Sequence, residues 1–124
     1  MEKNKVDEKY YYDERFACYD IIKNTKFETN TVYQWRRKYL RANKNHVCPT
    51  LTANMGTGGH NVPLVKDAWG IRKLTPRECA RIQGFPESFV LPKIADSKLY
   101  QQFGNSVTVT VVERIAKEII KVIS

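Results

Sequence analysis

The last third of the chain has the clearest periodic pattern of apolar positions. Beyond Val107, apolar residues recur at spacings of three and four, which places them on one broad face of a helix. These positions are Val111, Val112, Ile115, Ala116, Ile119, Ile120 and Ile123. The small-residue stretch Gly104-Asn105-Ser106 directly precedes them, and we expect Asn105 or Ser106 to cap the first turn. Such a turn can hold a polar ligand, although an ordinary C-terminal helix that closes a core has the same pattern.

A second helix is predicted to begin at Thr75. Thr75 can serve as N-cap, Pro76 occupies the first helical position, and Glu78 completes a capping box. The helix is expected to end near Gly84. A further short helix is expected over residues 97–103, leading into the C-terminal helix.

The first part of the chain has β-favouring patterns. Residues 31–41 are rich in β-branched and aromatic residues and predict one strand. Alternation would place Tyr33, Trp35, Arg37 and Tyr39 on one face of it. The other face would carry Gln34, Arg36, Lys38 and Leu40. Short strands are also expected at residues 47–52 and 62–65, so the pattern predicts an α+β fold.

Three glycines lie close together between the last two predicted strands. Gly56, Gly58 and Gly59 fit neither a dinucleotide fingerprint nor a P-loop, because the Gly-Lys-Ser/Thr sequence is missing. Glycine lets the backbone approach a partner closely, which suits entry into a DNA groove. A plain hairpin loop explains this segment equally well.

The charge pattern indicates a polyanionic partner. The chain has 21 Lys and Arg against 13 Asp and Glu, a net charge of +8. Residues 29–66 contain six basic residues and no acidic one. Nucleic acid is therefore the first expectation and an anionic membrane surface the second. No apolar run is long enough for a membrane span. Arg36, Arg37 and Arg41 are candidates for guanine or phosphate contacts, and a solvated basic strand is the alternative.

The cysteine and histidine pattern gives no sign of a metal site. Three cysteines without C-x-x-C spacing make a disulfide framework or a zinc site improbable and fit a reducing cytoplasm. His46 and His60 are too few and too scattered for a metal cluster.

Three segments resemble the DNA cytosine-5 methyltransferases. Residues 72–86 and 101–107 are similar to the motifs usually numbered nine and ten, and residues 49–59 resemble the end of the target-recognition region. The resemblance implies that Asn105 and Ser106 help to form the S-adenosylmethionine pocket. It also implies that residues 72–86 orient the target-recognition region.

The resemblance also implies a DNA-reading surface. Thr50 and Leu51 match a Thr-Leu pair at the base of the DNA-reading loops, while the roles of the arginines come from charge and context. The residues expected to contact DNA are Arg36, Arg37, Arg41, Thr50, Leu51, Gly56, Gly58 and Gly59. We expect residues 1–70 to form the target-recognition region, and residues 71–124 to form a helical segment that docks on the catalytic domain.

Two catalytic elements of that family are missing from the sequence. The nucleophile lies in a Pro-Cys-Gln setting and the carboxylate in Glu-Asn-Val, and neither sequence occurs here. Cys48 and Cys79 are more simply structural. We therefore expect no catalytic residue in this chain and predict that a catalytic N-terminal portion, on the same or another polypeptide, supplies them.

The predicted function is recognition of double-stranded DNA for cytosine C5 methylation in a bacterial or phage restriction-modification system. Two alternatives stay open at this stage. One is a stand-alone DNA-binding module, and the other is an RNA substrate, as in a tRNA branch that shares these motifs. Exposure of Ile115, Ile119 and Ile120, or self-association through them, would favour the assembled enzyme over the independent module.

Overall fold

The computed structural model describes residues 1–57 and 61–124, and the statements below concern these residues. Its sheet is antiparallel, with strand order β2-β1-β3-β4. The strands are β1 (Tyr33–Arg36), β2 (Tyr39–Ala42), β3 (Leu64–Lys66) and β4 (Ile71–Lys73). β1 pairs with β2 along its whole length and joins β3 through Tyr33 and Leu64.

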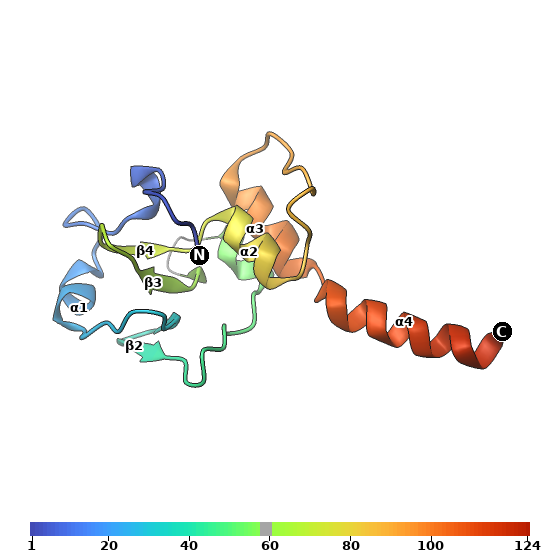
Figure 1. Ribbon diagram of the computed structural model, residues 1–124. Coiled ribbons are helices and arrows are strands. Elements are labelled where there is room, and N and C mark those ends of the chain that lie inside the picture. The colour runs from blue at the N-terminus through green and yellow to red at the C-terminus, as the bar shows by residue number, and fades with distance from the viewer. Residues whose placement is uncertain (58–60) are drawn as a thin grey trace.

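The helices lie mostly on the C-terminal side of the chain (Figure 1). The α-helices are α1 (Tyr19–Asn24), α2 (Pro76–Ile82), α3 (Asp96–Asn105) and α4 (Val109–Ile123). Two short 3-10 helices are η1 (Glu8–Tyr10) and η2 (Ala53–Gly56). A small antiparallel sheet followed by C-terminal helices confirms the expected α+β fold.

Residues 31–41 form a hairpin, so the prediction of one continuous strand was wrong. The chain reverses at Arg37 and Lys38, where Arg37 adopts a left-handed conformation with φ of 39°. Cross-strand partners share a face of the sheet, and Trp35 lies opposite Leu40. The predicted two faces are corrected accordingly. Tyr33, Trp35, Leu40 and Ala42 face one way, and Gln34, Arg36, Tyr39 and Arg41 face the other.

Two apolar clusters hold the fold together. One lies between the hairpin and α1 and contains Tyr33, Leu40 and Ile22. The other lies between the β3–β4 hairpin and the helices. Its buried members are Tyr10, Leu51, Met55, Val62, Val65, Leu74, Cys79, Ala80, Leu99, Tyr100 and Phe103. The second cluster contains residues from both sides of residue 70, so residues 1–70 and residues 71–124 share a core.

The start of α2 follows its local sequence closely. The Thr75 hydroxyl accepts a hydrogen bond from the Glu78 N–H, and the Glu78 carboxylate accepts one from the Thr75 N–H. The predicted capping box is therefore confirmed. Gly84 follows the helix with φ of 85°, the left-handed conformation that favours glycine after a helix end.

The segment before α4 differs from the prediction. Asn105 is the last residue of α3 and Ser106 caps its C-terminus, so neither caps α4. Thr108 is the N-cap of α4 and makes no side-chain capping bond. Gln83 connects the end of α2 to the end of α3 and the start of α4. Its side-chain amide Nε2 donates to the Phe103 carbonyl, and its backbone carbonyl accepts from the Val109 N–H.

Two smaller expectations were also corrected. Residues 47–52 are not a strand but an irregular segment that leads into η2, and the returning strand covers Leu64–Lys66 instead of residues 62–65. The residues from 53 to 56 pack against α3 instead of extending a hairpin.

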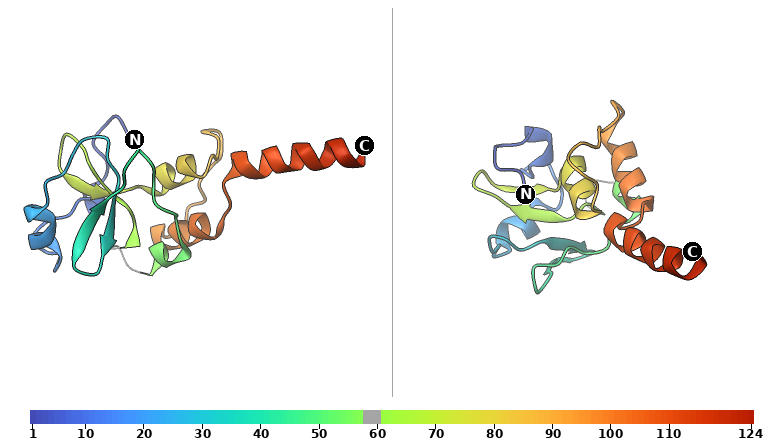
Figure 2. Two further views of the ribbon diagram at one scale, coloured as in Figure 1. Left: turned by 90° about the horizontal axis from the view of Figure 1, so that it is seen from below. Right: turned by 45° about the vertical axis from the view of Figure 1, so that its right-hand side comes forward.

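Helix α4 projects away from the rest of the molecule, as two further views show (Figure 2). Its first turn lies beside Gly84, and no residue of α4 is buried. Its apolar face therefore has no partner within the described part of the chain.

Candidate functional site

The outward face and turn of the β1–β2 hairpin form a basic surface. We call it the hairpin surface, and it consists of Gln34, Arg36, Arg37, Lys38, Tyr39 and Arg41. Tyr39 is 58% exposed, so no element among the described residues covers its side chain. Among the residues that the structure describes, none of its four basic side chains pairs with a carboxylate. The positive charge is therefore uncompensated and available to an anionic partner.

One side chain of the hairpin surface was missed by sequence reasoning. Gln34 lies directly opposite Arg41, and its Oε1 accepts a hydrogen bond from Arg41 Nη2 at 3.0 Å. The Asn43 side chain accepts from the same nitrogen at 3.4 Å. The sequence does not single out Gln34, because Arg41 becomes its cross-strand partner only when the chain folds back at Arg37. The register of the hairpin is the signal that identifies Gln34 as the partner of Arg41.

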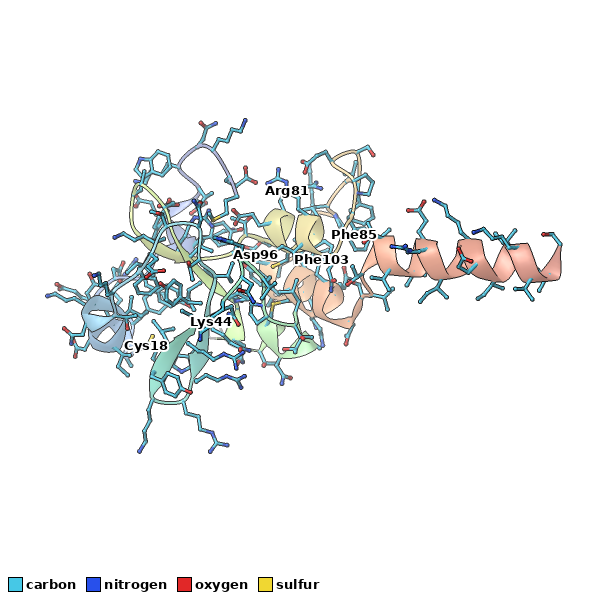
Figure 3. The ribbon with its side chains drawn as sticks, turned by 60° about the horizontal axis from the view of Figure 1, so that its bottom comes forward. Cys18, Lys44, Arg81, Phe85, Asp96 and Phe103 are labelled. Atoms are coloured by element: carbon cyan, nitrogen blue, oxygen red, sulfur yellow. The ribbon has the colours of Figure 1, made fainter. Side chains whose placement is uncertain are left out.

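A hollow of about 440 Å³ adjoins the hairpin surface. It is lined by Trp35, Arg36, Arg37, Tyr39 and Asn61. Aromatic faces beside guanidinium groups are a common lining for nucleic-acid contacts. Lys44, which follows β2, lies away from the hairpin turn (Figure 3).

The glycine-rich segment is only partly described. Gly56 closes η2 against α3, where an added Cβ would lie 2.5 Å from the Ser97 carbonyl oxygen. Glycine is therefore required at position 56 for the close packing of η2 against α3. Gly58 and Gly59, also expected to contact DNA, lie outside the described residues.

The Thr50-Leu51 pair and Ser106 line one hollow, of about 580 Å³, between the α2 end and the start of α4. Its lining comprises Cys48, Pro49, Thr50, Leu51, Ile82, Gln83, Gly104, Ser106, Val107, Thr108, Val111 and Val112. Thr50 is exposed, whereas Leu51 is buried in the core. Leu51 therefore belongs to the core and anchors this irregular segment to it.

Asn105 and Ser106 present polar groups at the end of α3. The Asn105 side chain is exposed and makes no hydrogen bond within residues 1–57 and 61–124. The Ser106 hydroxyl donates to the Phe103 carbonyl at 2.8 Å, which leaves its oxygen free to accept. These groups can form hydrogen bonds with a polar ligand. They do not enclose one, so other residues would have to complete a pocket.

The cysteines are poorly suited to nucleophilic catalysis. Burial raises the pKa of the Cys79 thiol far above its ordinary value and that of Cys48 to about 11. Cys79 lies on the buried side of α2 and is fully buried, and burial likewise raises the pKa of Cys18. All three thiols are therefore protonated at neutral pH, and a thiol is a much weaker nucleophile than a thiolate.

A buried ion-pair network joins the sheet to α2. The Arg72 guanidinium donates to both carboxylate oxygens of Glu78, at 2.7 and 3.0 Å, and to Asp67 at 2.6 Å. The Glu78 capping role was predicted from sequence, but its second partner was not. An arginine in a β-strand gives no local sign that it is fully buried.

The described residues contain no group of His, Cys, Asp or Glu side chains placed to hold a metal ion. None of the described helices has the length and apolarity that crossing a membrane requires.

Comparison with known proteins places the chain in a family. The family model described as C-5 cytosine-specific DNA methylase matches residues 1–121. The chain belongs to this family. C-5 cytosine methylases in general use S-adenosylmethionine as methyl donor.

The similarity extends to individual methylases. The Type II methyltransferase M.Bsp6I of Bacillus sp. (strain RFL6) is 58% identical over 119 residues, which are 95% of this chain and 38% of the relative. M.DsaV of Dactylococcopsis salina is 46% identical over 74 residues, 60% of this chain and 21% of that protein. M.HpaII of Haemophilus parainfluenzae is 54% identical over 52 residues, 42% of this chain and 14% of that protein. The chain thus spans well under half of these methylases.

Proposed function

We propose that this chain is the DNA-recognition portion of a DNA (cytosine-5-)-methyltransferase. In the assembled enzyme, a methyl group passes from S-adenosylmethionine to C5 of cytosine within a specific duplex sequence. The observation that carries the proposal is the hairpin surface, whose four cations have no carboxylate partner among the described residues. A two-stranded ribbon of this kind fits the major groove of B-form DNA. The family match supplies the reaction.

The bond-forming residues of this reaction belong to a catalytic portion outside the 124 residues. Cytosine methylation at C5 requires a thiolate and an acidic partner beside an extruded base. The protonated cysteines of this chain do not meet that requirement. The chain also spans only 38% of M.Bsp6I, which leaves room for a catalytic portion in a protein of that type.

Helix α4 is the proposed docking element for that catalytic portion. Ile115, Ile119 and Ile120 are 55%, 54% and 58% exposed, and together they form a continuous apolar face. A stand-alone DNA-binding module would cover this face within the chain. The exposed face therefore favours the assembled enzyme, and when the catalytic portion is absent the face would promote self-association.

Asn105 and Ser106 are proposed to contact the cofactor. Both lie within a few residues of the α4 start, so docking of α4 carries them to the catalytic portion. S-adenosylmethionine supplies the activated methyl group when bound. The side chains of this chain bind and orient it through the Asn105 amide and the Ser106 hydroxyl oxygen.

The biological setting that we propose is a restriction-modification system. The relatives named above are Type II methyltransferases. A methylase in such a system protects host DNA by methylating one particular sequence. A dedicated recognition portion with a reading hairpin suits this need for sequence specificity.

Reconstitution tests the proposed function. The chain is mixed with the part of M.Bsp6I that it does not match, and transfer of a labelled methyl group to duplex DNA is measured. We expect transfer from the mixture and none from either part alone. Activity in the isolated chain would contradict the assignment of catalysis to another portion. Binding of duplex DNA by the full chain, measured across a salt series, is an independent check. An absence of affinity for any duplex would remove the recognition role.

A further inference from the structure

We propose that Arg41 reads a guanine in the major groove and that Gln34 is the positioning residue that orients it. This inference rests on the proposed function and deepens it, because it assigns different tasks to the basic residues of one hairpin. In this assignment, Arg37 and Lys38 at the turn hold phosphates, and Arg41 on the strand reads a base.

The first step is the placement of Arg41. It lies in β2, an edge strand of the sheet, and its side chain projects from the hairpin surface. Strand positions are held by backbone pairing, here to Gln34 of β1, so the Cα of Arg41 is fixed relative to the sheet. Arg37 and Lys38 have no such cross-strand partner, because they form the turn.

The second step is the orientation of the guanidinium. Arg41 Nη2 donates one hydrogen to Gln34 Oε1 at 3.0 Å. The second contact of Nη2, to Asn43, is longer at 3.4 Å and more easily exchanged for a base acceptor. When the Asn43 contact is released, the freed Nη2 hydrogen and an N–H of Nε or Nη1, neither of which bonds to the described residues, form a parallel pair along one edge of the guanidinium. Guanine presents O6 and N7 at the spacing that such a pair contacts.

The third step is the cost of ordering. A free arginine loses rotamer freedom when it binds a base, and that loss reduces both affinity and discrimination. The bond to Gln34 imposes part of this order before DNA arrives. No carboxylate of the described chain competes for the Arg41 guanidinium, whereas the buried Arg72 has both Glu78 and Asp67 as partners. Because its charge is paired with carboxylates, Arg72 is a structural residue, whereas the unpaired charge of Arg41 is available to DNA.

The test uses the full 124-residue chain and duplex DNA. Selection from a random duplex pool gives the preferred sequence of the wild-type chain. Each guanine of that sequence is then replaced in turn by 7-deazaguanine, in which a C–H group stands in place of N7. We expect one position at which the wild-type chain loses about tenfold in affinity, the order of discrimination that a bidentate contact provides.

Two variants of Arg41 identify the reader. Arg41→Ala should weaken binding of the preferred sequence by a similar factor and then show no further loss with 7-deazaguanine at that position. Arg41→Lys keeps the charge but not the paired donors, so it should retain non-specific affinity and lose the preference. Lys44→Ala removes an exposed basic side chain outside the hairpin and should leave the 7-deazaguanine penalty intact.

Gln34→Ala isolates positioning from contact. It should reduce the penalty at the same guanine while leaving affinity for unrelated duplexes unchanged. The inference is overturned if Arg41→Ala keeps the full penalty at every guanine, or if Gln34→Ala alters nothing. No duplex binding by the wild-type chain would instead refute the proposed function itself. Because Gln34 and Arg41 belong to the solvent-facing side of the hairpin, circular dichroism should show all these variants folded.

Discussion

Arg72 and Glu78 form a two-bonded ion pair that is buried on both sides. The side chain of Arg72 is 0% exposed and that of Glu78 is 3% exposed. The pair connects β4 to the first turn of α2, and the Glu78 carboxylate also accepts from the Thr75 N–H. The pair is costly to break, because the buried Arg72 loses two charge-assisted hydrogen bonds and keeps only Asp67 as a carboxylate partner. This junction therefore fixes the helices relative to the sheet that carries the hairpin surface.

Glu78→Gln should destabilise the chain and change its response to acid. Burial opposes ionisation of Glu78, but the bonds from Arg72, Thr75 and Glu2 outweigh it and lower the Glu78 pKa below 4.5. A lowered pKa gives stability that is complete above pH 4.5 and is lost as the pH falls through the folded-state value. We expect a loss of about 1.5–3 kcal/mol near neutral pH, the range for hydrogen bonds to a charged group, because Asp67 still compensates the charge of Arg72. The gap between wild type and variant should narrow in acid.

Denaturant unfolding at several pH values measures this effect. Glu87→Gln is the matched control, since Glu87 pairs with Arg81 on the surface and its loss should alter the unfolding free energy little. If Glu78→Gln showed the same decline with acid as the wild-type chain, Glu78 would not be the group responsible.

Gly104→Ala should destabilise the chain although it lies in a helix. Glycine to alanine in a helix usually adds stability. Here the new Cβ would lie 2.1 Å from the carbonyl carbon and oxygen of Thr52, both backbone atoms. We expect a loss of about 1–3 kcal/mol, typical of overpacking, in denaturant unfolding. Gln102→Ala, exposed on the same helix, is the control. An increase in the free energy of unfolding would show that the backbone at Thr52, which precedes η2, moves away from the new methyl group without cost.

Ile119→Glu should weaken assembly without unfolding the chain. Ile119 is 54% exposed and touches no core residue, so the free energy of unfolding should change by less than about 0.5 kcal/mol. Binding to the catalytic portion, measured by co-purification and by methyl transfer, should fall sharply. Self-association of the isolated chain, measured by sedimentation, should fall as well. Glu118→Gln on the polar side is the control, and a large loss of stability in Ile119→Glu would place α4 inside the fold.

Local chemistry was enough to predict some elements and not others. The Thr75 capping box and the apolar face of α4 depend on residues within one or two turns of each other, and both were predicted. The hairpin was missed because Arg37 and Lys38 are not turn-forming residues and the flanking residues all favour strands. Its reversal becomes evident only from the pairing of β1 with β2.

The residues of the candidate site likewise divide into those that local sequence identifies and those that depend on distant contacts. Arg36, Arg37 and Arg41 could be selected by charge alone, and they share one hairpin. Gly104 was interpreted as part of a turn, because no local pattern reveals its contact with Thr52, more than 50 residues earlier. Gln34 depends on a cross-strand partner and was likewise invisible. Contacts distant in sequence explain these errors, since helical and strand periodicity report only on neighbours.

Arg37→Gly should weaken DNA binding while leaving the fold as stable as before or more so. Arg37 holds φ of 39° in the left-handed region, which costs a residue with a Cβ roughly 1–2 kcal/mol. Glycine avoids this cost but gains freedom in the unfolded chain, so the net gain in unfolding free energy should be between zero and about 1 kcal/mol. A strained arginine at a tip is expected where the side chain has a function. Duplex affinity should fall by the same factor for all sequences. In a salt series, the slope of log affinity against log salt concentration should decrease by about one. Arg37→Asn tolerates the same φ and removes the same charge, so it should match Arg37→Gly in binding. Unchanged affinity in both variants would place the turn outside the DNA interface.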